Sequence, residues 1–408
     1  MPGPRNRASL KFTLAIEAVV NNDGLVNRLT GRTGRIGLSI ITAGLLVAAG
    51  ASVSSAEATT APTAPDNALV TGVAAPGARN AWVVGGYEAG AAEIWHWNGS
   101  TWSRAALPAS LPGPKAVAAQ GSSAWAVGEN GRAGTTGILR LLKGKWIKSP
   151  SPRYSGWLDG VAIAPGGGAW AVGVNEAAQA LPLILRWNGS TWSTARITTP
   201  PAMVPTSGVL EAVTAPGANS AWAVGGDGRD PLIFHWDGHH WSMQFPASVP
   251  GNTLFGTLYG VAASSPDNVW AVGNSPGPKN NSPITTLIMH WDGHRWSRVP
   301  SPNPSPKTGG TWLSSVAVTR TGGAWAVGYT MGGEGVPVIL HWDGHHWTRV
   351  PSPDPYASME GSDGYAELTS VAAVPDGTAL TVGWAGPSYQ SLILRWNGHV
   401  WVPDPLAS

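Results

Sequence analysis

Small and large apolar residues alternate in a five-residue segment that recurs seven times along the chain. Its clearest copy is Ala324-Trp-Ala-Val-Gly328, which is followed after a polar gap by the apolar run 338–342 and a polar turn closed by Trp347. The second-position residue recurs every 43 to 55 residues, close to the repeat length of propeller blades. Alternation over a few residues, ended by Gly, is typical of a short β-strand.

Each repeat contains four strand-like pieces. In the first repeat they are residues 69–75, 81–85, 93–97 and 101–104. Asn98-Gly99 separates the last two, and Asn-Gly or Asp-Gly stands at this place in six of the seven copies. This dipeptide predicts a two-residue type I′ hairpin turn, because both central residues of that turn need positive φ. The predicted register places Trp95 opposite Trp102, so that Trp97 and Trp102 become diagonal neighbours on one face.

A four-stranded sheet of this size cannot bury such a face alone, but stacking against the next copy covers it and a closed ring has no bare ends. We therefore predict an all-β fold, a seven-bladed β-propeller of four-stranded antiparallel blades. Every copy runs from first to fourth strand in order, so blade one should meet blade seven by face packing without strand exchange. The predicted propeller spans 68–405, with blades at about 68–110, 111–152, 153–200, 201–248, 249–305, 306–358 and 359–405.

The first 58 residues have the pattern of an export signal. Arg28, Arg32 and Arg35 precede an apolar run from Ile36 to Ala49, and a small-x-small cleavage site follows near Ala58. The run is shorter than the roughly 20 residues that span a bilayer, so we expect a secreted protein without a stable membrane span. The region before the run is unusually long, and residues 59–67 look like a linker. Whether the signal is cleaved stays open.

Composition narrows the possible partners. The chain has a net charge of +2, 12% charged residues and no Cys. This balance excludes a nucleic-acid binder that relies on a basic face. An exported chain without Cys has no disulfides and must be held by packing. We expect a monomer.

The strand order and the Trp-Asn/Asp-Gly hairpin resemble a Kelch-type blade, the propeller type of the central domain of galactose oxidase. A diglycine of that type is present at Gly85-Gly86 and Gly225-Gly226 only. The hairpin element is also similar to the repeats of tectonin-like and bacterial propeller lectins. The resemblance implies the fold more strongly than a function, since one fold hosts many sites.

The residue types bear on several kinds of enzymatic and metal site. All ten His lie within the hairpin repeats, where equivalent positions on neighbouring blades are too far apart to ligate one ion, so we predict structural roles and no metal or cofactor. Copper oxidase chemistry of the galactose oxidase type needs a Tyr–Cys cross-link, which a chain without Cys cannot form. Glycoside hydrolysis needs two carboxylates about 5 to 9.5 Å apart. Acidic residues of the loops, including Glu129, Asp159 and Glu211, could supply them.

The variable loops on one face are better candidates for function, because recognition usually resides in variable loops on a rigid scaffold. Aromatic residues outside the repeat pattern gather in these segments and suit stacking on a sugar or a peptide. We expect ligand contacts from Trp157, Trp312, Trp384, Tyr87, Tyr329, Asp227 and Glu129. The favoured function is a non-catalytic binding module for an extracellular glycan or protein. A secreted glycoside-active enzyme and a structural surface repeat protein are the alternatives.

Overall fold

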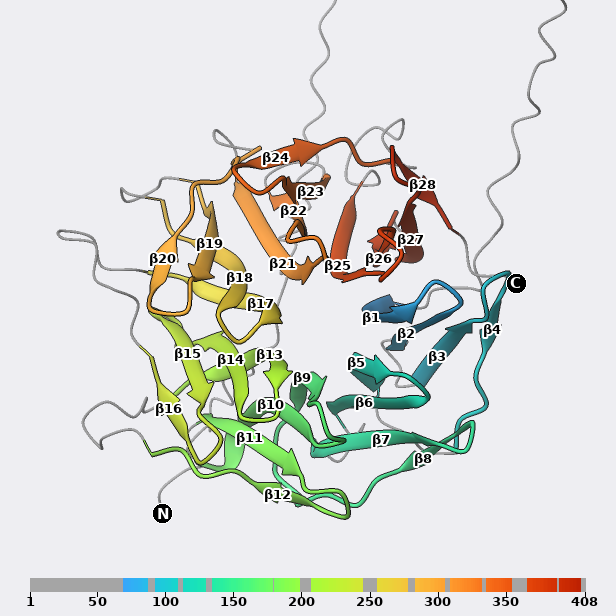
Figure 1. Ribbon diagram of the computed structural model, residues 1–408, viewed down its shortest axis with the longest axis vertical. Helices are drawn as coiled ribbons and strands as arrows, with labels where there is room; N and C mark the ends of the chain where they lie inside the picture. Colours follow the sequence, from blue (N-terminus) through green and yellow to red (C-terminus); the bar gives the residue numbers. More distant parts are fainter. Residues whose placement is uncertain are drawn as a thin grey trace, which may run out of the picture. The chain divides into compact units, whose positions relative to one another are not determined.

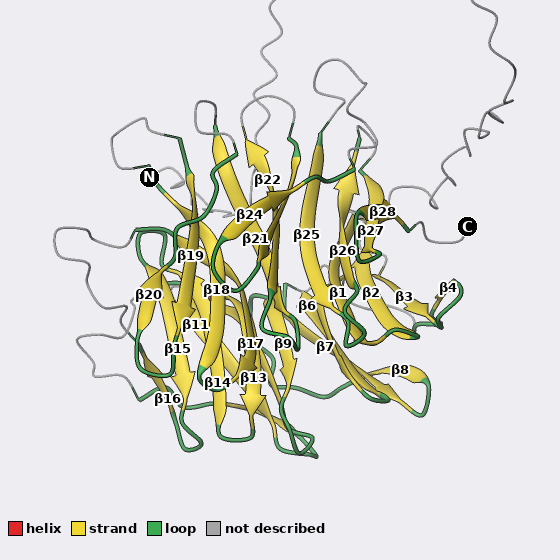
Figure 2. Ribbon diagram, turned by 45° about the horizontal axis from the view of Figure 1, so that its top comes forward, coloured by secondary structure: helices red, strands yellow, loops and turns green. Residues whose placement is uncertain are grey.

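The computed structural model describes residues 69–404 except for the segments 87–91, 109–112, 130–133, 179, 199–206, 245–254, 278–282, 305–308, 332–334, 354–364 and 387–388. The predicted export signal, the predicted linker and Tyr87 lie outside the described residues. Seven four-stranded antiparallel sheets stand around one axis, with the first strand of each innermost (Figure 1). The predicted seven-bladed β-propeller is confirmed. Figure 2 shows that the described part is nearly all strand and loop.

The blades follow the chain in order. Blade 1 contains β1 (Leu69–Gly77), β2 (Asn80–Gly86), β3 (Ala92–Trp97) and β4 (Trp102–Arg104). Blade 2 contains β5 (Gly113–Gln120), β6 (Ser123–Glu129), β7 (Thr136–Leu142) and β8 (Lys145–Lys148). Blade 3 contains β9 (Leu158–Ile163), β10 (Ala169–Asn175), the short 3₁₀ helix η2 (Glu176–Ala178), β11 (Leu181–Trp187) and β12 (Trp192–Thr194).

The remaining blades have the same order. Blade 4 contains β13 (Val209–Gly217), β14 (Ser220–Gly226), β15 (Pro231–Trp236) and β16 (Trp241–Met243). Blade 5 contains β17 (Thr257–Ser265), β18 (Asn268–Ser275), β19 (Thr285–Trp291) and β20 (Trp296–Arg298). Blade 6 contains β21 (Gly310–Val318), β22 (Ala324–Met331), β23 (Pro337–Trp342) and β24 (Trp347–Val350). Blade 7 contains β25 (Ala366–Ala373), β26 (Ala379–Ala385), β27 (Gln390–Trp396) and β28 (Trp401–Pro403).

The core is divided among the seams between blades. Seven hydrophobic clusters each combine residues of two adjacent blades. The second strand is buried on both faces, and its alternation explains the repeated sequence. Trp82 and Val84 pack toward blade 2, where the small residues Ala124 and Ala126 face them, while Ala81 and Val83 pack toward blade 7. Large side chains on one face therefore fit small ones on the next blade.

Indole rings fill the outer part of each seam. Trp222 of blade 4 meets Trp296 of blade 5 edge to face, with ring centroids 5.2 Å apart, and Trp291 lies 4.9 Å from it. The other face of Trp222 stacks on His235 at 4.1 Å. His96 makes the same stacked contact with the second-strand Trp of its blade, and His290 and His341 make tilted contacts with theirs at 4.2 and 4.3 Å. Arg140 and Arg186 lie over this Trp in blades 2 and 3, and Arg395 pairs with Leu380 in blade 7. These histidines are packing residues, as predicted.

The ring closes between blades 7 and 1 without strand exchange, as predicted. Leu380 stands in the second strand of blade 7 where the other six blades have Trp, and it packs with Trp95 and Trp102 of blade 1. The hydroxyl of Thr369 donates to the carbonyl of Val70 across this seam at 3.1 Å. Apolar packing and side-chain hydrogen bonds therefore join the two ends of the ring.

The predicted register of the β3–β4 hairpin is wrong. Trp97 pairs directly with Trp102, not diagonally. The side chain of Asn98 accepts hydrogen bonds from the backbone N–H groups of Ser100 and Thr101, both at 2.9 Å, and Gly99 takes a positive φ of 99°. The Asn or Asp side chain thus caps the turn. The pairing differs from the predicted one because the partner of Trp102 is Trp97 and not Trp95.

The other Asn-Gly and Asp-Gly hairpins repeat this cap. A two-residue turn with positive φ at both central residues occurs instead in blade 2. There Lys143 (φ 50°) and Gly144 (φ 76°) connect the paired residues Leu142 and Lys145. The copy that looked degenerate in sequence is therefore the one that has the predicted turn type.

Candidate functional site

Each innermost strand carries a β-bulge at the same register. In blade 1, Val70 pairs with Gly85 and Gly72 with Val84, so Thr71 is the extra residue. The Gly that ends each second-strand repeat permits this irregularity, because a Cβ on Gly85 would lie 2.0 Å from the carbonyl oxygen of Leu69. A bulge redirects a side chain out of the regular ladder.

The seven bulge residues form a ring around the propeller axis, which we call the axial ring. Its members are Thr71, Lys115, Asp159, Glu211, Tyr259, Ser314 and Thr369.

The axial ring lies near the end of the blades where the first strands begin and the second strands end, here called the entry end. The opposite end, with the β3–β4 type turns, is called the hairpin end. The ring differs in chemistry from blade to blade, whereas the strands around it are nearly uniform.

Blades 2 to 4 give the axial ring its charged part. Lys115 Nζ donates to Asp159 Oδ1 at 2.9 Å, from one blade to the next. The Asp159 side chain is only 10% exposed. Its second oxygen, Oδ2, is buried and has no partner with good hydrogen-bond geometry in the described structure. A weaker hydrogen bond from Trp157 only partly opposes the burial that raises the pKa of this carboxyl. The hydrogen-bonding capacity of the Asp159 carboxyl is therefore only partly used.

Burial dominates the acidity of both carboxyls in this part of the ring. It raises the pKa of Glu211 to about 8, with the charge of Asp159 acting in the same direction and Lys115 against it. Burial also raises the pKa of Asp159, opposed by the charge and hydrogen bond of Lys115. One ammonium thus faces two carboxyls, and burial favours the protonated form of both.

Blades 5 to 7 carry a continuous series of aromatic rings at the entry end, which we call the aromatic track. Its members in order are Tyr259, Trp312, Tyr329, Tyr365, Trp384 and Tyr389. Successive ring centroids are 5.6, 5.9, 6.2, 5.0 and 4.9 Å apart. Tyr329 is buried, Tyr389 is 46% exposed, and the other four are half-buried. The track thus runs from the axial ring outward over three blades.

Local packing fixes the middle of the track. A Cβ on Gly335 would lie 2.2 Å from the Tyr365 ring, so this ring rests directly on the backbone of blade 6. The backbone N–H of Ala366 donates to the Gly335 carbonyl at 2.7 Å. Glu367 pairs in register with Trp384, and burial raises the pKa of this carboxyl to about 7. A second carboxyl that is easily protonated therefore lies beside the track.

The structure brings together three of the seven residues expected to contact a ligand. Trp312, Tyr329 and Trp384 are members of the aromatic track. Trp157 lies apart from it, under Lys115, whose Nζ is 5.0 Å from the ring centroid. Glu129 is the last residue of β6, and its charge raises the pKa of Asp159.

Asp227 joins neither group. Its Oδ1 accepts the backbone N–H groups of Arg229 and Asp230 at 2.9 and 2.7 Å, so this carboxylate caps a tight turn. Tyr87 is among the residues that the structure leaves undescribed.

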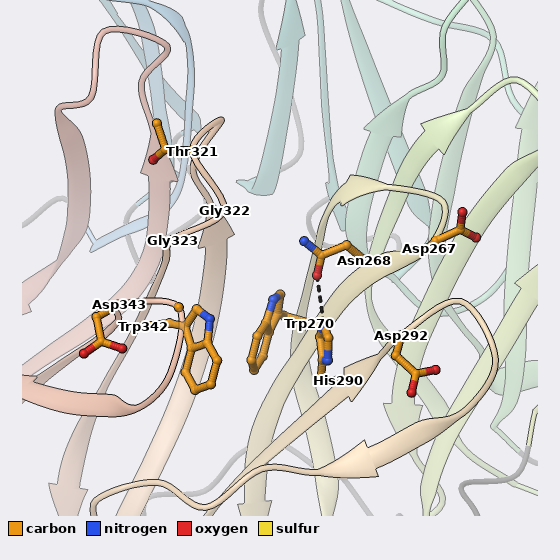
Figure 3. Close-up of a pocket in the computed structure, with 11 residues that line it drawn as sticks. Asp267, Asn268, Trp270, His290, Asp292, Thr321, Gly322, Gly323, Trp342 and Asp343 are labelled. Carbon is orange, nitrogen blue, oxygen red and sulfur yellow. Dashed lines mark hydrogen bonds between the residues drawn. The ribbon is translucent and has the colours of Figure 1, made fainter.

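A separate cleft of about 480 Å³ opens at the hairpin end between blades 5 and 6. Trp270 and Trp342 lie side by side in it, and Asn268 is hydrogen-bonded to His290 (Figure 3). Two of its three carboxylates, Asp292 and Asp343, cap their own hairpin turns, and Asp267 is exposed. The cleft is shaped by repeat residues, whereas the entry end is shaped by residues that vary among blades.

The described residues include no helix that is long and apolar enough to cross a membrane. They contain no group of three or more His, Asp and Glu side chains that could hold a metal ion.

No protein-family model and no curated protein matches this chain. The fold is similar to that of the GH74 xyloglucanase from Xanthomonas campestris, with a TM-score of 0.54 and 16% identity over 83% of this chain and 54% of that one. This chain therefore spans about half the length of the xyloglucanase.

Two WD40 propellers are also similar. The WD40 β-propeller domain of Doa1 has a TM-score of 0.52 at 11% identity, over 83% of this chain and 95% of that one. The WD40 repeats of RRP9 have a TM-score of 0.53 at 11% identity, over 83% and 99%. These similarities show the propeller fold and do not single out the Kelch type.

Sequence reasoning missed the axial ring and the role of Lys115. A signal for the ring is present, because each bulge residue stands two positions before a repeated Val of the first strand, as Lys115 does before Val117. This position varies from blade to blade while its neighbours stay small or apolar. Asp159 and Glu211 were expected only as acidic residues of the loops that could pair.

Proposed function

We propose that this chain is an exported, non-catalytic binding module whose entry end binds an extracellular glycan. The aromatic track is the observation that carries the proposal. It offers a series of rings over three rigid blades, and Tyr and Trp supply contact area at small entropic cost. Export is supported by the charged and apolar pattern of the first 58 residues.

The polar groups beside the track supply orientation. Glu211 borders Tyr259, whose phenol pKa is raised by burial and by the Glu211 charge, and Glu367 borders Tyr365. Binding sites commonly combine apolar and aromatic walls with a few polar groups that fix the ligand's orientation. This combination favours a polyhydroxylated ligand that also has apolar ring faces. A protein partner is the competing ligand class.

A glycan array with the purified protein tests the proposal. Binding to a set of glycans should be lost in the double variant Trp312→Ala with Trp384→Ala. The matched control is Ile147→Ala, an exposed apolar residue of the outer strand β8, which should bind as the wild type does. If no glycan binds, or if the double variant keeps its binding, the stacking site is wrong. Circular dichroism of each variant checks that it is folded.

One observation favours a second candidate, a glycoside-active enzyme. The charge of Asp159 acts on the Glu211 carboxyl, and a pKa of about 8 would keep Glu211 protonated as a general acid requires. Release of reducing sugar from a bound glycan, abolished in Glu211→Gln, would establish this activity. Stable binding without product would favour the module.

A further inference from the structure

Three neighbouring positions of the axial ring, Lys115, Asp159 and Glu211, carry ionisable groups, unlike the two threonines of the ring. Thr71 and Thr369 donate to backbone carbonyls of the next blade, Pro114 and Val70, so they are satisfied locally. Lys115, Asp159 and Glu211 instead combine one ammonium with two carboxyls. The third, Glu211, is linked by charge to Tyr259 at the start of the aromatic track.

The Asp159 carboxyl lacks a hydrogen-bond donor at one of its two oxygens. Its side chain is nine-tenths buried and its Oδ2 lacks a partner with good geometry in the described structure. A buried acceptor without a donor is costly, and more so when it is charged. A cationic donor that reached this oxygen would remove the penalty and also compensate Glu211.

Lys115 shows that an ammonium group fits here. Its Nζ lies 2.9 Å from Asp159 Oδ1 and 5.0 Å from the Trp157 ring centroid, contacts that recur where proteins recognise ammonium ligands. The Lys115 side chain is 44% exposed, and it reaches the site from the neighbouring blade on a flexible stem. It can therefore swing away and leave its place to a ligand.

We propose that Asp159, Glu211 and Trp157 form an ammonium site for an amino-sugar glycan, in which Lys115 is the occupant of the free protein. This inference rests on the proposed glycan-binding function and names the class of glycan. The aromatic track runs from this site to Glu367, so carboxyls flank the rings at two places along it. Repeated aromatic contacts with repeated carboxyls match a polymer of like units, each with a ring face and an ammonium group.

The site links binding to proton release. The charges of Asp159 and Lys115 act on the pKa of Glu211, and the charge of Glu211 acts on the pKa of Tyr259. Glu129, at the end of β6, raises the pKa of Asp159. Glu211 holds a proton at neutral pH because its pKa is about 8. An ammonium ion favours the carboxylate form, so binding at a pH where the amines of the probe are already protonated should expel this proton into the buffer.

Calorimetry with a matched pair of ligands tests the inference in the full chain. The probes are a glucosamine oligosaccharide and its fully N-acetylated counterpart of equal length, titrated in two buffers of different ionisation enthalpy. The ammonium-bearing oligosaccharide should bind about tenfold more tightly, the scale of one charge-assisted contact. It should release a proton, whereas the N-acetylated one should not.

Three variants show which residues cause the tighter binding of the ammonium-bearing probe and the proton release. Glu211→Gln should weaken binding of the ammonium-bearing probe about tenfold and abolish proton release. Lys115→Met should strengthen its binding, because the internal competitor is gone. Asp267→Asn, which removes an exposed carboxylate at the hairpin end, should change neither quantity.

The outcomes are separable. Equal binding of both oligosaccharides would overturn the ammonium site and leave the glycan-binding function standing. Binding of neither, with other glycans positive on the array, would likewise overturn the site alone. Capture of a lysine-rich peptide with no binding of any glycan would overturn both and indicate a protein partner. Weaker binding in Lys115→Met would show that Lys115 is part of the site and not its competitor.

Discussion

Replacement of Trp222 tests how the seams hold the ring. This side chain is fully buried, with Trp291, Trp296 and His235 around its indole. Trp222→Ala removes the rings' common neighbour without touching the entry end. Trp222→Leu introduces the residue that blade 7 has naturally at this position, Leu380.

The expected magnitudes follow from the buried surface. A buried Trp removes about 150–250 Å² from water, worth roughly 4–6 kcal/mol at about 25 cal/mol per Å². Trp222→Ala should therefore lower the free energy of unfolding by about 4–5 kcal/mol, near the upper end for large-to-small changes. Trp222→Leu should lose about 2 kcal/mol less than Trp222→Ala, because the Leu side chain is still buried. Leu380→Ala, at the equivalent position, should cost about 2–3 kcal/mol.

Urea unfolding followed by far-UV circular dichroism measures these differences. The predicted order of midpoints is wild type, then Trp222→Leu and Leu380→Ala, then Trp222→Ala. Ile147→Ala on the surface should stay within about 0.5 kcal/mol of wild type. The reasoning is refuted if the midpoint of Trp222→Ala coincides with that of Ile147→Ala, because the buried indole would then contribute nothing to the seam.

Three further predictions concern the site and the closure. Gly335→Ala should push the Tyr365 ring aside and weaken glycan binding while a folded circular dichroism spectrum is kept; unchanged affinity would contradict this. The pKa of Glu211 is higher in the folded protein than its ordinary 4.5, so the native state binds more protons and stability should fall as pH rises from about 5 to about 8. Glu211→Gln should flatten this fall in urea titrations at several pH values, and an identical slope would contradict it. Thr369→Val should lower stability by about 1 kcal/mol by removing the bond to Val70 across the closing seam, and an unchanged midpoint would show that this bond is dispensable.

The blade pattern could be predicted from sequence because it rests on local rules. The apolar segment 81–85, ended by Gly, predicts a short strand, and the structure buries its two faces against blades 2 and 7. The hairpin register could not be predicted from the Asn-Gly dipeptide alone. Asn98 has two ways to make a turn, with its own backbone at positive φ or with its side chain, and the side chain prevails.

The candidate site was predictable only in part. Trp312 and Trp384 were expected at the entry end because of their positions beside the strands. The contact of Trp312 with Tyr259 joins two blades, and the contact of Trp384 with Tyr365 depends on the exact placement of the loop before β25, so neither could be predicted. The axial ring depends on a bulge, which shifts the alternation of the first strand by one residue, and the strand pairing that reveals this shift is seen only in the structure. Lys115 therefore looked like an ordinary surface lysine until the neighbouring blade brought Asp159 to it.

The location of a bound glycan is the most direct test of the account. The measurement is a crystal structure of the protein soaked with the array's strongest glycan. The account predicts sugar density against Trp312 and Trp384 at the entry end. Density in the cleft beside Trp342 and Asp267 at the hairpin end, with the aromatic track uncovered, would contradict it.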